Sequence, residues 1–434
     1  MLTSCDHVEK IYQKLSIQND CKFEKLMLGA IFQFVYYDKL NVEKVSVFDL
    51  KSLFEKFEGI IVTAKLADSK NKHVCDSSSI NFVISQCVDT INYSCATESL
   101  IHYISAKWEK ECQLINRKNY QYLLSALVTK PELKSMVFQL SWDISVIFNS
   151  QKYHEKFKFY LWDTICSYII FSDVLKKNPE CISVSLNPYH SMDLGMILAC
   201  QDFKNKVWFM PHGLPQKSMY LHTFDYVTPL TLIDPQWRRF RAKPIYLPWS
   251  ESRGLYPRES NQKISCKNIK ILFFSQFSGS DLHQMDTLVD SSFEVINKLI
   301  LRSDISTITI RLRHEDEESK YLPLLDCSKI SISYANKTSV SVDIRGNDIL
   351  AACSSTALLY GQTYNKPVIQ ILDSTIERIW PYYLTSEERI INVAFNISSQ
   401  LNHALTDIYE KPFNTKILYK GVVSDYKNLF EDSN

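Results

Sequence analysis

Three short polar stretches in the C-terminal half of the chain contain residue types that bind phosphate in proteins. Hydroxyl groups at the start of a helix act together with its free N–H groups and its dipole to attract an anion. Arginine adds charge-assisted hydrogen bonds to phosphate oxygens. The stretches are Ser275 with Gln276; Arg311, Arg313 and His314; and Ser354, Ser355 and Thr356. Together they predict a site for a phosphate-bearing ligand.

Each stretch also has a plain structural explanation. Ser354 can simply cap a helix, and the two arginines can form ion pairs with Glu315, Asp316 and Glu317. The phosphate hypothesis therefore depends on where the chain places the three stretches.

A regular alternation of apolar runs and helical patterns surrounds these stretches. Strands are expected over residues 269–277, 306–314, 330–333, 348–353 and 366–371, with an amphipathic helix over 286–301. Such an alternation predicts a parallel sheet built from right-handed βαβ units. Strands of a parallel sheet end at one common edge, so the three stretches are expected to lie together there. Arg311 and Arg313 are expected on the same face of their strand.

Two loops in the N-terminal half follow expected strands and carry acid–base groups. A strand over 181–185 leads to a loop with Asn187, His190 and Asp193, and a strand over 207–210 leads to His212 and Gly213. Asp193 or His212 is the expected proton acceptor, and Gly213 allows a ligand to approach the backbone closely. The alternative is an ordinary polar loop and a structural histidine.

The remaining N-terminal sequence is less regular. Residues 1–150 mix helical patterns, such as 47–57, with short apolar runs, such as 59–64, and indicate a mixed α/β half. A basic patch of Arg238, Arg239, Arg241 and Lys243 is a solvated helix face, a docking site for an anionic lipid or polysaccharide, or part of a phosphate pocket. Polar, irregular residues 251–268 are the expected interdomain linker.

Composition limits the class of protein. The 434 residues are 45% hydrophobic and 22% charged with a net charge of +1, which is typical of a globular protein and excludes a global attraction to nucleic acid. Twelve cysteines lack paired or zinc-like spacing, so we expect reduced thiols and no metal. We recognise no signal peptide, no apolar run long enough to span a membrane and no glycine-rich nucleotide motif. A cytoplasmic protein is expected, with peripheral contact to the inner face of the plasma membrane through the basic patch.

The order of these motifs resembles that of bacterial GT-B glycosyltransferases that build surface polysaccharides. The resemblance covers about residues 181–372 and rests on Pro211-His212-Gly213, the three polar stretches and Lys366-Pro367-Val368-Ile369. The chain looks most like the sialyl-, polysialyl- and Kdo-transferases, which use CMP-activated sugars, and more distantly like polyol-phosphate transferases of wall teichoic acid synthesis. In those transferases a His-Pro motif and a Ser-Ser/Thr motif bind the donor phosphate.

Residues 354–356 match the second motif. His314 stands at the place of the first, with Glu315 where those transferases have proline. The acidic base motif of some sialyltransferases is not recognisable.

The resemblance implies an α/β fold of two Rossmann-like domains facing across a cleft. Residues 1–250 would bind a glycan or glycolipid acceptor, residues 269–385 would bind the nucleotide-sugar donor, and a helical segment over 386–434 would pack back on the first domain. The implied activity is metal-independent glycosyl transfer from a nucleotide-activated sugar, such as CMP-Kdo or CMP-sialic acid, in capsule or lipopolysaccharide synthesis. A catalytically silent sugar-nucleotide-binding subunit, a polyol-phosphate transferase and a sugar-nucleotide epimerase are the alternatives.

Overall fold

The structure is a computed structural model of the chain. The described residues are 47–68, 80–86, 91–148, 151, 154–188, 190–211, 224–228, 242–245, 267–275, 292–312, 318–352, 364, 366–372, 390–394 and 405. They belong to two compact units, a first unit with the described residues from 47 to 245 and a second unit with those from 267 to 405.

The first unit contains a six-stranded parallel sheet of order β2-β1-β3-β4-β5-β6. The strands are β1 (Phe82–Gln86), β2 (Cys112–Asn116), β3 (Ile182–Ser185), β4 (Val207–Phe209), β5 (Tyr226–Val227) and β6 (Lys243–Pro244). Every residue of β1, β3 and β4 is buried, as expected of parallel strands that helices cover on both faces. The mixed α/β character expected for residues 1–150 is therefore present in the described part, and it includes the two strands β1 and β2.

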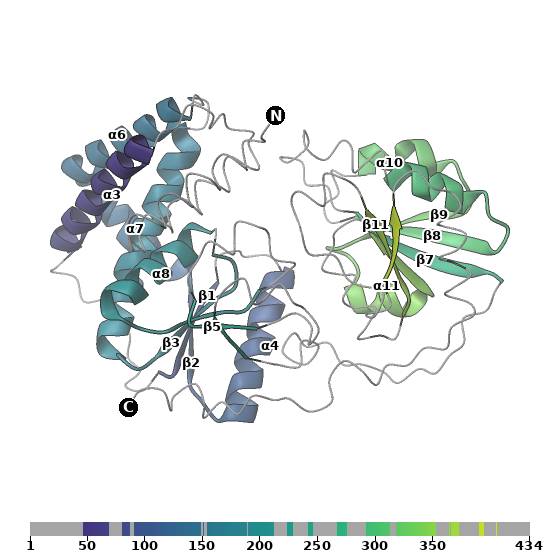
Figure 1. Ribbon diagram of the computed structural model, residues 1–434, viewed down its shortest axis with the longest axis horizontal. Helices are drawn as coiled ribbons and strands as arrows, with labels where there is room; N and C mark the ends of the chain where they lie inside the picture. The colour runs from purple at the N-terminus through teal and green to yellow at the C-terminus, as the bar shows by residue number, and fades with distance from the viewer. Residues whose placement is uncertain are drawn as a thin grey trace. The chain divides into compact units, whose positions relative to one another are not determined.

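Helices enclose this sheet. They are α3 (Val47–Asp68), α4 (Ile91–Trp108), the short η1 (Arg117–Tyr120), α5 (Gln121–Val128), α6 (Pro131–Ile147), α7 (His154–Lys177) and α8 (Ser191–Phe203). Figure 1 shows α4 on one side of the sheet and α7 and α8 on the other, with α3 and α6 outside α7. Helices α7 and α8 pack closely at Gly195, where a Cβ atom would lie 2.5 Å from the carbonyl oxygen of Thr164.

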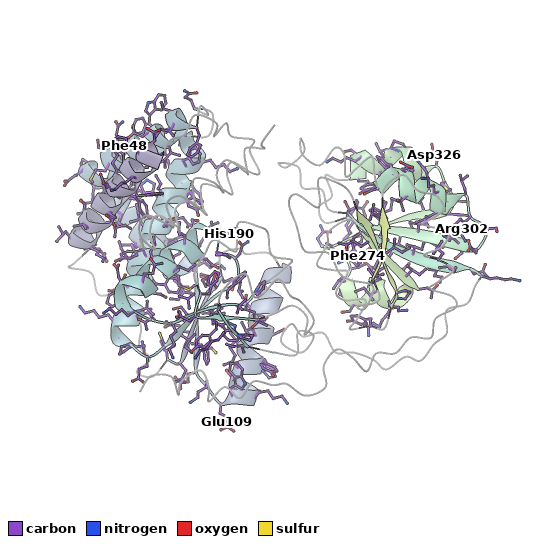
Figure 2. All side chains as sticks on the ribbon, in the orientation of Figure 1. Phe48, Glu109, His190, Phe274, Arg302 and Asp326 are labelled. Atoms are coloured by element: carbon purple, nitrogen blue, oxygen red, sulfur yellow. The ribbon has the colours of Figure 1, made fainter. Side chains whose placement is uncertain are left out.

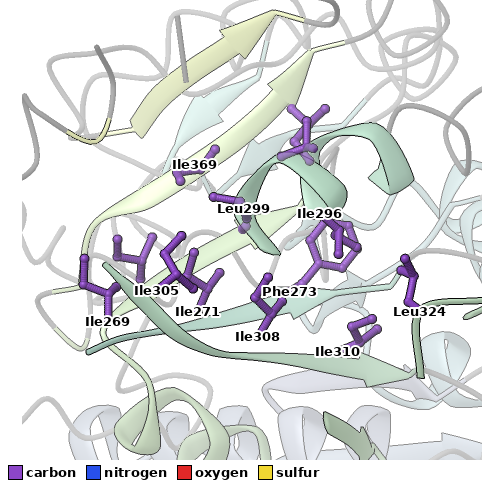
Figure 3. Close-up of a cluster of buried hydrophobic side chains, with 14 of the residues drawn as sticks. Ile269, Ile271, Phe273, Ile296, Leu299, Ile305, Ile308, Ile310, Leu324 and Ile369 are labelled. Carbon is purple, nitrogen blue, oxygen red and sulfur yellow. The ribbon is translucent and has the colours of Figure 1, made fainter. Parts of the chain in front are cut away.

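The second unit contains another six-stranded parallel sheet, of order β12-β11-β10-β7-β8-β9. The strands are β7 (Ile269–Phe274), β8 (Ile305–Leu312), β9 (Ile330–Tyr334), β10 (Ile349–Ala352), β11 (Val368–Leu372) and β12 (Ile390–Ala394). Residues 292–300 are helical, and α10 (Glu318–Leu325) and α11 (Val340–Gly346) lie on opposite faces of the sheet in Figure 1. Figure 3 shows the core on one face, where isoleucines of β7 and β8 pack against Ile296 and Leu299.

These two sheets confirm the predicted α/β class with two Rossmann-like domains. Strands lie in all five places where the C-terminal alternation predicts them, with ends that differ by a few residues. Two sequence interpretations were wrong. The apolar run 59–64 lies inside α3, because its residues continue the buried face of a long helix. The run Ile-Ile-Asn-Val-Ala at 390–394, expected within a helical segment, is strand β12, as suits its β-branched residues.

Two expectations fall largely outside the described residues. Of the basic patch, only Lys243 is described, and it is an exposed residue of β6. Of the expected linker, only residues 267 and 268 are described. None of the described helices is long and apolar enough to cross a bilayer.

Candidate functional site

The second sheet has a topological switch point between β7 and β10. From β7 the chain continues to β8 and β9 on one side, and β10 then pairs with the other side of β7, with Ala351 opposite Phe273. The carboxyl ends of β7 and β10 are therefore neighbours. In doubly wound sheets the ends of such strands diverge into a crevice that receives the ligand.

Ser275 lies at this edge, directly after β7. It is buried, its hydroxyl accepts a hydrogen bond from the Tyr321 hydroxyl at 3.1 Å, and its backbone N–H donates to the Arg311 carbonyl at 3.0 Å. The ends of β7 and β8 thus meet, as the sequence predicts. The other residues of the three polar stretches lie outside the described residues: Gln276, Arg313, His314, Ser354, Ser355 and Thr356.

Arg311 is buried in an internal network. Its guanidinium forms an ion pair with Asp343 and donates to the Thr338 hydroxyl at 2.9 Å and to the Thr338 carbonyl at 2.8 Å. Ser333 also donates to Asp343, at 2.5 Å. The network ties α11 and the turn before it to the end of β8.

This arrangement corrects the expectation of a guanidinium at Arg311 that is free to bind phosphate. Among the described residues, the ion-pair partner is Asp343 of a later helix; Glu315, Asp316 and Glu317, the partners considered from the sequence, lie outside the described residues. A single buried charge needs a partner, and α11 brings the carboxylate of Asp343 to the sheet edge.

The first sheet has its own switch point, between β1 and β3, and Asp193 joins the two strands there. One carboxylate oxygen accepts a hydrogen bond from Ser85 of β1. The other accepts from the Ser185 hydroxyl of β3 at 2.8 Å and from the N–H groups of Leu186 and Asn187 at 3.1 and 2.8 Å. Asp193 therefore holds the loop that follows β3, including the predicted Asn187.

Asp193 is wrong as the expected proton acceptor. Its side chain is fully buried and both oxygens are engaged, so an acceptor hydroxyl could not reach it. Burial raises the pKa of this carboxyl to about 6, and its four hydrogen bonds oppose that rise by stabilising the charged form. The residue stands in the first turn of α8, from which its side chain turns back to the loop.

A second buried carboxylate, Asp163 of α7, was missed by sequence reasoning. It accepts hydrogen bonds from the Tyr120 hydroxyl at 2.5 Å, from Arg117 Nη2 at 3.2 Å and from the Ser191 hydroxyl. Arg117 and Tyr120 follow β2, and Ser191 begins α8, so Asp163 joins two loops at the carboxyl edge of the sheet. The signal was present, because an acidic residue within the most apolar tract of the sequence needs buried partners.

His190 is the third described group of this edge. It precedes α8, and its backbone N–H donates to the Asn187 carbonyl at 3.0 Å. Burial, and next the charge of Arg117, lower the pKa of its imidazole to about 4, while Asp163 acts in the opposite direction. His190 is therefore neutral near pH 7. Figure 2 labels it in the first unit, beside α8.

The electrostatics of this edge disfavour a bound phosphate. The start of α8 already has Asp193 in its first turn, and Ser191 binds the carboxylate of Asp163. A helix N-terminus attracts negative charge, and here the protein's own carboxylates supply it. Within the parts of the chain that the structure describes, no cluster of three potential metal ligands occurs.

His212 and Gly213 follow the end of β4 but lie outside the described residues. Pro211, the last described residue before them, is buried. Their catalytic and acceptor-side roles stay predictions.

Comparison with known proteins gives similarities of structure alone. No family model and no curated protein matches the sequence. The apo form of the lipopolysaccharide outer core galactosyltransferase WaaB is 12% identical with a TM-score of 0.45, covering 82% of this chain and 100% of that chain. The UDP-forming α,α-trehalose-phosphate synthase of Burkholderia vietnamiensis is 9% identical with a TM-score of 0.41, and the match covers 82% of this chain and 92% of that chain. A mutant O-GlcNAc transferase of Thermobaculum terrenum is 8% identical with a TM-score of 0.41, and the match covers 99% of this chain and 77% of that chain. The two doubly wound sheets by themselves identify the chain as a two-domain α/β protein of Rossmann-like topology.

Proposed function

We propose that this protein is a metal-independent GT-B glycosyltransferase that moves a sugar from a nucleotide-activated donor to a glycan or glycolipid acceptor. A CMP-sugar such as CMP-Kdo or CMP-sialic acid is the favoured donor, and capsule or lipopolysaccharide synthesis is the favoured setting. The observation that carries the proposal is the switch point of the second sheet. It makes neighbours of the strands that lead into Ser275 and into the stretch 354–356.

The second unit is proposed to bind the donor. Ser354, Ser355 and Thr356 would bind its phosphate at a helix N-terminus, and His314 would stabilise the leaving phosphate as charge develops on it. Gln276, which follows the buried Ser275, would contact the same ligand. This assignment agrees with the charge of the first unit, whose switch point is already occupied by carboxylates.

The first unit is proposed to bind the acceptor through the loops that follow β3 and β4. Asn187 and Gly213 would line this side, and His212 would contribute acid–base chemistry. Arg238, Arg239, Arg241 and Lys243 would hold the enzyme on the cytoplasmic face of the plasma membrane. Lys243, the one of these four that the structure describes, is exposed.

Nucleotide release from a panel of CMP-, UDP- and GDP-sugars tests the reaction class. Release that requires a glycan acceptor supports a transferase, and UDP formation without an acceptor indicates an epimerase. Absence of turnover with every donor, although CMP binds, would mean a silent sugar-nucleotide-binding subunit. Transfer of a polyol phosphate would point to the wall teichoic acid enzymes.

A double substitution, Ser355→Ala with Thr356→Ala, tests the donor site. It should weaken CMP binding by about 1–3 kcal/mol, because two hydroxyl hydrogen bonds to the phosphate are lost. The exposed Glu132 of α6 offers a control, Glu132→Gln, which should bind CMP normally. Unchanged affinity for CMP, UDP and GDP in the double variant would rule out the proposed phosphate site.

A further inference from the structure

We propose that His190 is a catalytic residue of the first unit, which accepts the proton of the acceptor hydroxyl during glycosyl transfer. This inference rests on the proposed function and gives His190 the proton-accepting role for which the sequence offered Asp193 or His212. Three features of the structure carry it: the place of His190 beside the sheet, the hydrogen bonds that hold its backbone, and a ring without a hydrogen-bond partner among the described residues.

The place of His190 is the carboxyl edge of the first sheet at its switch point. The residue lies between β3 and α8, in the loop that begins next to Ser85 of β1. Ligands of doubly wound sheets bind at this place, so a side chain in this loop is well situated to meet a substrate.

The backbone of His190 is held from two directions. Asp193 accepts hydrogen bonds from the N–H groups of Leu186 and Asn187, and the N–H of His190 donates to the Asn187 carbonyl. On the other side, Ser191 donates to Asp163. A catalytic group gains from such support, because its orientation need not be found anew in each turnover.

The ring of His190 has no hydrogen-bond partner among the described residues. By contrast, both carboxylates of this edge are saturated: Asp163 by Tyr120, Arg117 and Ser191, and Asp193 by hydroxyls and backbone N–H groups. Of the titratable side chains described at this edge, His190 is thus the one with a ring nitrogen available to a ligand.

The charges around His190 keep it in the form that a base requires. Arg117 and Asp163 are the charged groups that act on the ring, and they pair with each other at 3.2 Å. Burial adds to the effect of Arg117, so the pKa of the imidazole falls to about 4 and the ring carries a free lone pair at neutral pH. The carboxylate of Asp163 acts in the opposite direction and offsets part of the cost of protonating the ring.

The proposed step transfers a proton to His190 and a glycosyl group to the acceptor. The acceptor hydroxyl gives its proton to a ring nitrogen of His190, and its oxygen forms the new bond to the anomeric carbon of the donor sugar. The bond between that carbon and the phosphate oxygen breaks, and its electron pair leaves with the nucleotide. The imidazolium then releases the proton to water.

Two substitutions test the role: His190→Gln, which keeps hydrogen bonding but removes basicity, and His190→Ala. Both should lower kcat by about 10²–10⁴-fold while CMP affinity stays at the wild-type value. His102→Gln is the matched control, because His102 is an exposed histidine of α4 on the same unit, and its kcat should be normal. Thermal unfolding of each variant checks that the fold persists.

The outcomes separate this inference from the proposed function. Wild-type transfer with normal kcat in His190→Gln would overturn the role of His190 and leave the transferase intact, whereas absence of transfer by the wild type overturns both. If both variants unfold, the pH dependence of wild-type kcat/KM decides. A fall in kcat/KM on acidification through a pKa between about 4 and 6.5 supports the inference, and a flat profile over that range contradicts it.

Discussion

Replacing Asp193 by asparagine tests whether this residue holds the fold or does chemistry. Asparagine has the shape of a protonated aspartate, so its oxygen can accept from Ser185, Leu186 and Asn187 while its amide donates to the Ser85 hydroxyl. The substitution removes a fully buried negative charge and keeps the hydrogen-bond geometry. We expect Asp193→Asn to be at least as stable as the wild type near neutral pH, and to retain transfer.

The magnitude follows from the pKa of the carboxyl. It lies at about 6 in the folded protein and at 3.8 ordinarily, and each pH unit of difference corresponds to about 1.36 kcal/mol. Ionisation of Asp193 therefore costs the folded state about 3 kcal/mol, which is the upper limit of the gain from asparagine. Asp193→Ala is the contrasting variant. It removes the acceptor of two backbone N–H groups, each worth about 1–3 kcal/mol, and should be strongly destabilised.

Urea unfolding of the wild type, Asp193→Asn and Asp193→Ala at a series of pH values measures these differences in stability. Because the folded pKa is raised, folding takes up a proton between pH 3.8 and about 6, so the stability that Asp193 contributes is full below 3.8 and lost as pH rises through about 6. The advantage of the asparagine variant over the wild type should be largest above pH 6 and disappear below 3.8. Comparison at each pH cancels the effect of His190, which both proteins share.

Two results would refute the reasoning. A folded Asp193→Asn protein that loses about 10²–10⁴-fold in kcat would make Asp193 the base after all. An asparagine variant as unstable as the alanine variant would mean that the charge itself, and not the hydrogen-bond pattern, holds the loop.

Three further predictions concern other parts of the structure. Gly195→Ala should destabilise the first unit by about 1–3 kcal/mol or more in urea unfolding, since its Cβ would clash with α7 backbone atoms, whereas Gly346→Ala, with no atom within 4 Å of its Cβ, should be tolerated. Arg311→Met should lower the free energy of unfolding by about 3–5 kcal/mol, because it leaves the mostly buried Asp343 without its ion-pair partner. A decrease of less than about 1 kcal/mol would contradict the buried pair. His190→Gln should lose less stability on acidification than the wild type. The pKa of His190 is lowered to about 4, so its contribution to folding stability is present above about pH 6.5 and is lost as the pH falls towards 4. Parallel profiles of stability against pH for the two proteins would disprove this.

Local sequence patterns were enough to predict most of the second sheet. Buried strands of a parallel sheet are short apolar runs, often of β-branched and aromatic residues; β7 and β8 have this composition, and β10 is a short run of aliphatic residues. The helix–strand alternation around them leaves few topologies, so the common edge of Ser275 and Arg311 followed from the order of the chain. The same logic failed at 390–394, where a short apolar run is compatible with either a helix or a strand.

What the sequence by itself determined was the class of the fold and the types of residue at its sheet edges. Only the tertiary structure decided which of those side chains are engaged inside the protein. Asp193 and Arg311 read as reactive groups along the chain, yet each is satisfied by partners from distant elements, Ser85 for the first and Asp343 for the second. Because burying a charge is unfavourable unless hydrogen bonds or an opposite charge compensate it, the availability of a charged group depends on contacts that sequence order does not encode. His190 shows the converse: the sequence placed it among the acid–base groups of its loop, and packing leaves its ring without a hydrogen-bond partner among the described residues.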